Sequence, residues 1–182
     1  MTTTRAGTIA PGTYRLVPDR CAVRFRTAHA FGLGPVHGTF AVLDGVIVVA
    51  ETHTDSRVTV SLDPASFTTD KPRRDKQIRS KAFLDVKRYP SMSFASTGLS
   101  PDLVVSGTLT AHGTTAPVTL TITSVQAAPG GLRCRATTRL DRHTFGVTTG
   151  RGLIGRYLDV ELDVASTVDS QPEDHGRTSV AS

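Results

Sequence analysis

Apolar and polar residues alternate one by one along several stretches of this chain. In residues 157–164 every second residue is apolar, and three of the four residues between them are acidic. Successive side chains of a strand point to opposite faces, so such a segment buries one face and exposes the other. Shorter stretches with the same alternation are 23–27, 58–62, 118–122 and 132–140. The pattern predicts a protein built mainly from β-strands with one apolar face.

The alternating and apolar runs predict about ten short strands separated by turn residues. These strands are expected near 13–18, 22–29, 36–43, 45–51, 56–63, 91–99, 102–111, 116–127, 132–140 and 157–167. The dipeptide Asp44-Gly45 separates two apolar runs, which predicts a tight hairpin at that point. Helices do not alternate with the strands, so a doubly wound parallel sheet is unfavourable and the chain is predicted to be all-β. Many short antiparallel strands of this kind form either a sandwich or a closed barrel.

One segment, residues 69–86, lacks the strand pattern and predicts a short helix near residues 72–82. Pro72 falls in its first turn, where the missing N–H costs nothing, and Thr69 or Asp70 is a candidate N-cap. The side chains of this segment expected to face the core are those of Ile78, Ala82 and Phe83.

Positive charge is concentrated around this helix. Residues 71–88 hold eight bases and two acids, a net charge of +6, whereas the whole chain carries only +5. Asp75 and Arg79 stand four residues apart, which favours a supporting acid–base pair on a helix. The basic segment 71–88 is either a solvated helix face or a surface that attracts phosphates or anionic lipids. It carries no recognised nucleic-acid motif and few aromatic residues, so we expect no nucleic-acid partner.

The length of 182 residues predicts one folded domain. We expect it to span residues 12–167, with disordered ends at 1–11 and 168–182, because both ends are polar and lack periodicity. No apolar run approaches the ~18 residues that a membrane-spanning helix needs. The first residues also lack the apolar core of a secretory signal, so a cytoplasmic location is expected.

The residues that usually carry catalysis or bind metals do not form a recognisable set. The six histidines are scattered without metal-ligand spacing, and no CxxC, GxSxG or P-loop motif occurs. Cys21 and Cys134 are expected to be buried, inert thiols. These patterns favour a binding protein over an enzyme and imply neither a metal nor a cofactor.

A series of short motifs, taken in order, resembles the YceI-like, polyisoprenoid-binding family. Its opening is matched by DRCAVRFRTAH at 19–29 and by Gly-Thr-Phe at 38–40. Its middle signature is matched by Ser66, Thr69, Arg74-Asp75, Phe83, Asp85, Tyr89-Pro90 and Phe94. GTLTAHG at 107–113 and DRHTFG at 141–146 match its later motifs, so the resemblance covers about residues 12–167.

This resemblance implies a lipocalin-like antiparallel barrel of about eight strands with a helix near one mouth. It also implies an elongated apolar cavity that holds a polyprenyl chain, a lipid quinone or a similar amphiphile. The expected function is therefore the non-catalytic binding, transport or storage of an isoprenoid-like lipid.

A lipid in such a cavity would contact inward apolar side chains and a few polar groups near the mouth. The residues predicted to bind it are Val23, Phe25, His29, Phe40, Val58, Val60, Arg74, Arg79, Phe83, Phe94, Leu109, Leu120, Ile122, Arg142 and Phe145. We hypothesise that at least one of four arginines meets an anionic head group by charge-assisted hydrogen bonds. These candidates are Arg73, Arg74, Arg79 and Arg142.

Two other functions compete with lipid binding. The first is a surface-interaction protein with a filled core that binds anionic partners, including a membrane surface, through residues 71–88. The second is an enzyme that uses the cavity with His29 or His143 as acid or base. The exposed faces of a barrel and the family resemblance make a homodimer a reasonable assembly.

Overall fold

The computed structural model describes residues 9–29, 34–150 and 154–169. Within them the chain forms nine strands, namely β1 (Gly12–Leu16), β2 (Ala22–His29), β3 (Val36–Val49), β4 (Arg57–Thr68), β5 (Met92–Leu99), β6 (Val104–Ala111), β7 (Thr114–Ala128), β8 (Gly131–Asp141) and β9 (Ile154–Val168). The helical elements are α1 (Pro72–Arg79) and the 3-10 turns η1 (Pro18–Arg20), η3 (His53–Asp55) and η4 (Arg142–Phe145). No helix among the described residues has the length and hydropathy needed to cross a bilayer.

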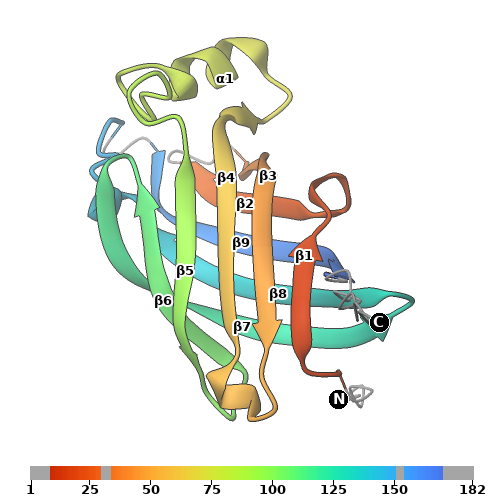
Figure 1. Ribbon diagram of the computed structural model, residues 1–182. Coiled ribbons are helices and arrows are strands. Elements are labelled where there is room, and N and C mark those ends of the chain that lie inside the picture. The colour runs from red at the N-terminus through yellow and green to blue at the C-terminus, as the bar shows by residue number, and fades with distance from the viewer. Residues whose placement is uncertain (1–8, 30–33, 151–153, 170–182) are drawn as a thin grey trace, which may run out of the picture.

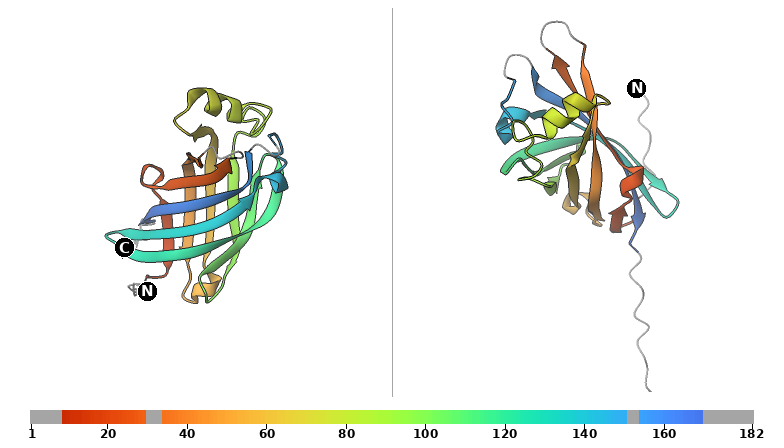
Figure 2. Two further views of the ribbon diagram at one scale, coloured as in Figure 1. Left: turned by 180° about the vertical axis from the view of Figure 1, so that it is seen from behind. Right: turned by 90° about the horizontal axis from the view of Figure 1, so that it is seen from above.

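Eight of these strands close into an antiparallel barrel, as the sequence predicted (Figures 1 and 2). The order runs β3-β2-β9-β8-β7-β6-β5-β4, and β4 then pairs with β3 to complete the circle. Strand β1 lies outside this circle and pairs with both β3 and β9. Because the barrel is closed, each of its strands has a hydrogen-bonded neighbour on both sides, and the sheet has no free edge strand.

The predicted hairpin at Asp44-Gly45 is wrong, because β3 passes through both residues without a break. Asp44 and Gly45 pair with Ser61 and Val60 of β4, and the next residues of β3, from Val46 on, pair with both β4 and β1. Just before Gly45 the pairing with β4 is irregular, because its register shifts between Val42 and Asp44. A Cβ on Gly45 would lie 2.5 Å from the Leu16 side chain and 2.9 Å from the carbonyl oxygen of Thr59. Gly45 therefore permits close packing within a strand and does not form a turn.

The predicted helix exists but is shorter than expected, because α1 ends at Arg79 and Ser80 is extended. Pro72 occupies its first turn as predicted, whereas the N-cap is Lys71, without a side-chain cap. Ile78 is half-buried and Phe83 is buried, but Ala82 is exposed, so the prediction for Ala82 is wrong. The chain has already left the helix at Ala82 and no longer follows its periodicity. The α1 segment follows β4 and stands over one end of the barrel (Figure 1).

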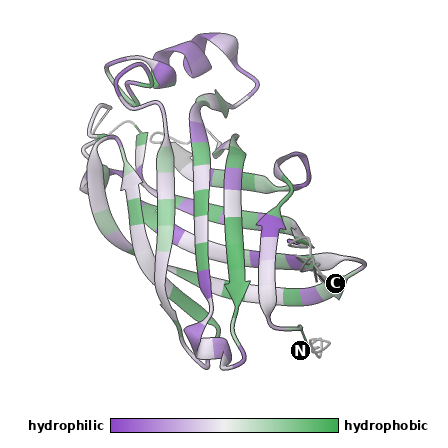
Figure 3. Cartoon of the chain, in the orientation of Figure 1, coloured by the Kyte–Doolittle hydropathy of each residue, from purple (hydrophilic) through white to green (hydrophobic). Residues whose placement is uncertain are grey.

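The apolar core lies on the inner faces of the strands, and hydropathy alternates along them (Figure 3). Near the α1 end, three aromatic rings pack together, with centroid separations of 5.7 Å for Phe25–Phe40 and 5.3 Å for both Phe25–Phe67 and Phe40–Phe67. A second cluster is centred on Phe145 and Ala111. The predicted inward faces of the alternating strands are thus confirmed.

At the chain ends, the described structure slightly exceeds the expected domain. Strand β9 continues to Val168, and the Asp169 N–H donates to the Thr13 carbonyl oxygen at 2.8 Å. The Tyr14 hydroxyl donates to the carbonyl oxygen of Ala10 at 2.7 Å. Residues 1–8 and 170–182, most of the two ends expected to be disordered, lie outside the described residues.

Replacing Gly38 with alanine is expected to destabilise the barrel by about 2 kcal/mol, because the added methyl group overpacks the aromatic cluster. Its Cβ would collide with the Phe25 ring and lie 2.7 Å from the Thr68 carbonyl oxygen. The control is Gly98→Ala, whose Cβ meets nothing within 4 Å. Urea unfolding of the two variants measures the difference, and equal stabilities would contradict the argument.

Candidate ligand-binding cavity

The barrel interior contains a cavity of about 800 Å³. Every barrel strand, β2 to β9, contributes side chains to its wall, and most of the lining side chains are aliphatic or aromatic. Its volume falls within the range of about 300–1,000 Å³ that is typical of small-molecule sites. A filled core, the basis of one alternative function, is therefore wrong for this chain.

Most residues predicted to bind a ligand do line the cavity. These are Val23, Phe25, Phe40, Val58, Val60, Arg74, Phe83, Phe94, Leu109, Leu120, Ile122, Arg142 and Phe145. Arg79 does not line it, and the side chain of His29 lies outside the described residues, although its backbone belongs to β2. Whether the lining residues contact a lipid stays a prediction.

Sequence reasoning did not nominate two groups of lining residues. The first group belongs to β8 and β9 and includes Leu132, Cys134, Leu158 and Val160. Their alternation was visible, so the signal for them was present. The second group lies in or next to connections between strands and includes His53, Ser56, Arg57 and Leu103. Periodicity does not extend through connections, so the sequence carried no signal for that end of the cavity.

The thiol of Cys134 faces this apolar interior. Burial, with a smaller contribution from the nearby Asp163 carboxylate, raises its pKa to about 11. Burial likewise raises the pKa of Cys21, although hydrogen bonds with backbone groups partly oppose the shift. Both cysteines are free thiols. Neither is poised as a thiolate nucleophile, in agreement with the sequence-based expectation.

Arg142, at the start of η4, is a buried arginine that joins two loops next to the cavity. Its side chain is only 6% exposed, and its guanidinium donates to four backbone carbonyl oxygens. Those acceptors are Val147 at 2.6 Å, Thr149 at 2.8 Å, Gly155 at 2.9 Å and Ile154 at 3.1 Å. The guanidinium thus holds the chain that follows η4 against the start of β9.

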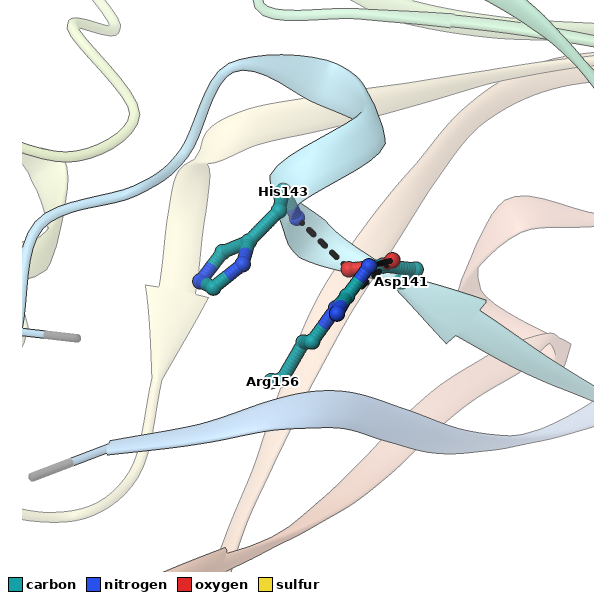
Figure 4. Close-up of polar contacts among 3 residues, drawn as sticks. All are labelled: Asp141, His143 and Arg156. Atoms are coloured by element: carbon teal, nitrogen blue, oxygen red, sulfur yellow. Dashed lines mark hydrogen bonds and ion pairs between the residues drawn. The ribbon is translucent and has the colours of Figure 1, made fainter. Parts of the chain in front are cut away.

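The Asp141 carboxylate fixes the start of the same turn (Figure 4). It accepts a hydrogen bond from the His143 N–H at 3.0 Å and two from the Arg156 guanidinium at 2.6 and 2.8 Å. The Arg156 hydrogen bond is the main reason that the pKa of Asp141 lies below its ordinary value. This arrangement positions η4, and His143 does not line the cavity.

At the α1 end, arginines attach the helix to β4. The Arg79 Nε and Nη2 atoms donate to the Phe67 carbonyl oxygen at 3.0 and 2.6 Å. The Arg74 Nε donates to the Thr69 hydroxyl at 2.8 Å, and its Nη2 lies 3.4 Å from the Thr69 carbonyl oxygen. Arg73 is exposed and does not line the cavity. Of the four candidate head-group arginines, Arg74 and Arg142 therefore reach the cavity, and both already donate to the protein.

Asp75 is a buried residue of α1 that connects the helix to the end of β4. Its carboxylate accepts a hydrogen bond from the Thr68 hydroxyl at 2.9 Å. It also accepts hydrogen bonds from the Thr69 hydroxyl at 2.5 Å and from the Thr69 N–H at 2.9 Å. Burial by itself raises the pKa of Asp75, but these hydrogen bonds and the Arg79 charge outweigh it and lower the pKa. In the predicted Asp75–Arg79 pair, the Arg79 charge thus stabilises the Asp75 carboxylate electrostatically, while the hydrogen bonds to that carboxylate come from the two threonines.

Asp75→Asn is expected to destabilise the protein at neutral pH and much less in acid. A carboxyl whose pKa falls on folding stabilises the protein fully above its unfolded value of about 3.9, and this contribution is lost as the pH falls through the folded value. Urea unfolding of wild type and variant between pH 7 and pH 3 measures the difference. Asp70→Asn, at an exposed position, is the control. A difference in the free energy of unfolding between wild type and Asp75→Asn that stays constant with pH would contradict this role for Asp75.

A closed eight-stranded antiparallel barrel around an apolar cavity, with a helix over one end, defines this protein as a lipocalin-like barrel. Within that class the chain belongs to the YceI-like domain family, whose sequence model matches residues 14–166. A UPF0312 protein of Pseudomonas putida strain GB-1 is 36% identical over 152 residues, which are 78% of each chain. A UPF0312 protein of Enterobacter sp. strain 638 is 32% identical over 151 residues, again 78% of each chain.

Solved structures share the fold at low sequence identity. Burkholderia cenocepacia BcnA superposes with a TM-score of 0.69 at 19% identity, over 84% of this chain and 99% of that one. A polyisoprenoid binding domain from Saccharophagus degradans superposes with a TM-score of 0.65 at 15% identity, over 87% of this chain and 99% of that one. These similarities establish the architecture of the barrel.

Proposed function

We propose that this protein binds an isoprenoid-like lipid in its cavity and transports or stores it without catalysis. The observation that carries the proposal is the predominantly apolar wall that all eight barrel strands build around a cavity of about 800 Å³. Burying hydrocarbon stabilises a complex by about 0.8 kcal/mol per CH₂, so each five-carbon isoprene unit contributes ~3–4 kcal/mol before costs. A few units therefore suffice for tight binding, without any polar contact.

The family relationship supports the same proposal. The Saccharophagus degradans domain with this fold is described as polyisoprenoid binding. A polyprenyl chain and the tail of a lipid quinone share a narrow, branched hydrocarbon shape, and a wall of aliphatic side chains does not distinguish strongly between them.

Native mass spectrometry of protein purified from its own host tests the proposal directly. We expect a bound species whose mass, after organic extraction, corresponds to a prenyl chain or a prenylated quinone. The outcome that would contradict a carrier role is a lipid-free protein that also takes up no fluorescent polyene lipid when it is titrated with one.

The same cavity is a poor setting for the alternative in which His143 acts as acid or base. His143 does not line the cavity, and its backbone N–H is engaged in capping η4. Among the described residues, no group of three His, Cys, Asp or Glu side chains is arranged to hold a metal ion. Turnover of a prenyl substrate by the wild type that His143→Ala abolishes would favour the enzyme.

The basic segment 71–88 supports a second candidate role, contact with an anionic lipid surface during delivery. Its exposed bases are Lys71, Arg73, Lys76, Lys81, Lys87 and Arg88. They belong to the polar segment that projects beyond the barrel (Figure 3). Each base near such a surface contributes about 1 kcal/mol, and salt screens the attraction.

Charge reversal of this segment is therefore expected to abolish binding to vesicles that contain phosphatidylglycerol. The variant is Lys71→Glu/Lys76→Glu/Lys81→Glu, measured by vesicle sedimentation at low and high salt. The same number of reversals on the outer face of β8, at Arg133, Arg135 and Arg139, is the control. Equal losses for both variants would show a net-charge effect and contradict a role for this segment. The homodimer and the cytoplasmic location stay predictions. Analytical sedimentation tests the first, and cell fractionation tests the second.

A further inference from the structure

The two ends of the cavity differ in the solvent exposure of the described residues that line them. Among all the described lining residues, only His53, Arg57, Leu103 and Thr123 are exposed. All four lie at the end opposite α1. His53, Arg57 and Leu103 lie where β3 connects to β4 and β5 connects to β6, and Thr123 follows Ile122 of β7, whose N–H donates to the Leu103 carbonyl oxygen. At the α1 end every described lining residue is buried or half-buried. We call the exposed end the η3 mouth, after the 3-10 turn that borders it.

Leu103 at this mouth is held in an unfavourable conformation. Its φ of 61° is left-handed, which is rare for a leucine, and its side chain is 47% exposed. The Leu103 N–H donates to the Ser100 carbonyl oxygen at 3.0 Å, and its own carbonyl oxygen accepts from the Ile122 N–H at 2.9 Å. These bonds keep an apolar side chain at the opening, where a hydrocarbon tail would pass. Strain of this kind is often maintained at functional positions.

Just inside the η3 mouth, two serine hydroxyls face the cavity with unused donors. The Ser96 Oγ accepts from the Val58 N–H at 2.8 Å, and the Ser56 Oγ accepts from the Ala50 N–H at 3.1 Å. These bonds fix both oxygen atoms in place. Neither hydroxyl has an acceptor for its own proton among the described residues. Both are therefore positioned to donate to an oxygen atom of a ligand.

The charge around this mouth disfavours an anion. The two segments that frame it, residues 50–57 and 100–103, contain three carboxylates, Glu51, Asp55 and Asp102, and one arginine, Arg57. Of these four only Arg57 lines the cavity, and its guanidinium donates to the carbonyl oxygens of Ser56 at 2.9 Å and Thr54 at 3.4 Å. The basic segment lies at the other end, where the guanidinium groups of Arg74, Arg79 and Arg142 donate to the protein itself. A neutral oxygen acceptor thus fits the available donors better than a diphosphate does.

We propose that the lipid enters through the η3 mouth tail first, and that its head group is an uncharged alcohol or carbonyl that accepts hydrogen bonds from Ser56 and Ser96. This inference rests on the proposed function and assigns the ligand both an orientation and a head-group class. It replaces the sequence-based hypothesis of an anionic head bound by arginines near the helix. The tail then extends toward Phe83 and Phe145 at the α1 end.

Photo-cross-linking determines the orientation without any substitution. The probe is a C20 prenyl alcohol with a diazirine next to its hydroxyl, irradiated in complex with the wild-type protein and mapped by peptide mass spectrometry. We expect adducts within residues 50–58 or 96–103. Adducts within 71–84 or 142–147 would place the head beside α1 and overturn the proposal.

Binding measurements determine the head-group class. We expect geranylgeraniol to bind at least tenfold more tightly than geranylgeranyl diphosphate. Ser56→Ala and Ser96→Ala should each weaken alcohol binding about fivefold, the loss of one hydrogen bond, and should leave binding of the hydrocarbon phytane unchanged. Ser93→Ala, on the outer face of β5, is the matched control. Tighter binding of the diphosphate, lost in Arg74→Gln, would overturn the proposal.

The phytane measurement separates this inference from the function on which it rests. If phytane and geranylgeraniol both fail to bind, the proposed lipid-binding function is wrong. If phytane binds but the alcohol gains nothing from the two serines, the cavity binds lipid and only the assigned head-group site is wrong.

Discussion

Replacing Arg142 with alanine is expected to lower the free energy of unfolding by about 4 kcal/mol, because it removes a buried charge-assisted hydrogen-bond network. The four carbonyl oxygens that accept from this guanidinium belong to two segments, Val147 with Thr149 and Ile154 with Gly155. Without the guanidinium these oxygens lose their charged donor, and the chain after η4 loses its attachment to β9. Urea unfolding followed by circular dichroism measures the loss.

Two further variants make the Arg142 result specific. Arg142→Lys keeps the positive charge but lacks the planar fork of donors, so we expect it to recover only a small part of the lost stability. Arg139→Ala removes an exposed arginine of β8, whose Nε lies 3.8 Å from the Asp159 carboxylate, and should change stability by less than about 0.5 kcal/mol. A loss for Arg142→Ala no larger than that for Arg139→Ala would contradict the structural role assigned to Arg142.

Replacing Val60 with tryptophan is expected to reduce lipid binding by at least about 100-fold while the barrel stays folded. The Val60 side chain points from β4 into the cavity, so an indole group at this position occupies space that the hydrocarbon chain needs. Displacing four methylene groups forfeits roughly 3 kcal/mol at about 0.8 kcal/mol each, which corresponds to a factor of about 100 or more. Titration with a fluorescent polyene lipid measures the affinity.

The matched control is Thr59→Trp, one residue earlier on the same strand and exposed on the outer face of the barrel. It introduces the same side chain without entering the cavity, so lipid binding should stay close to that of the wild type. Circular dichroism and thermal unfolding of both variants establish that the barrel is intact. Equal binding by Val60→Trp and the wild type would show that the lipid does not occupy the cavity.

Much of the fold and of the cavity wall was predictable because alternation is a local property. The inward positions of Phe25 on β2 and Leu120 on β7 follow from a period of two, and both side chains line the cavity. Pro72 correctly marked the first turn of the helix. The order of the family motifs indicated the closed barrel, which alternation by itself did not distinguish from a sandwich.

Predictions from local patterns failed where distant segments decide the outcome. Asp44-Gly45 is a typical turn sequence, but β4 pairs with both residues and β1 pairs with the strand from Val46 on, so the chain continues as a strand of the sheet. Arg142 was a candidate for an anionic head group, but its donors meet carbonyl oxygens five to thirteen residues away along the chain. In both cases the partners that determine the role do not appear in the local sequence pattern.

Most inward-facing side chains, the first turn of the helix and the concentration of positive charge were predictable from the chain alone, because they follow from the spacing of residues along it. The hollow interior, the arginines that donate to backbone carbonyl oxygens and the greater exposure of the described lining residues at the η3 end became known only from the folded structure. Those properties arise when strands pair into the barrel, since the pairing of β4 with β5 and of β5 with β6 brings η3, Ser96 and Leu103 to one rim.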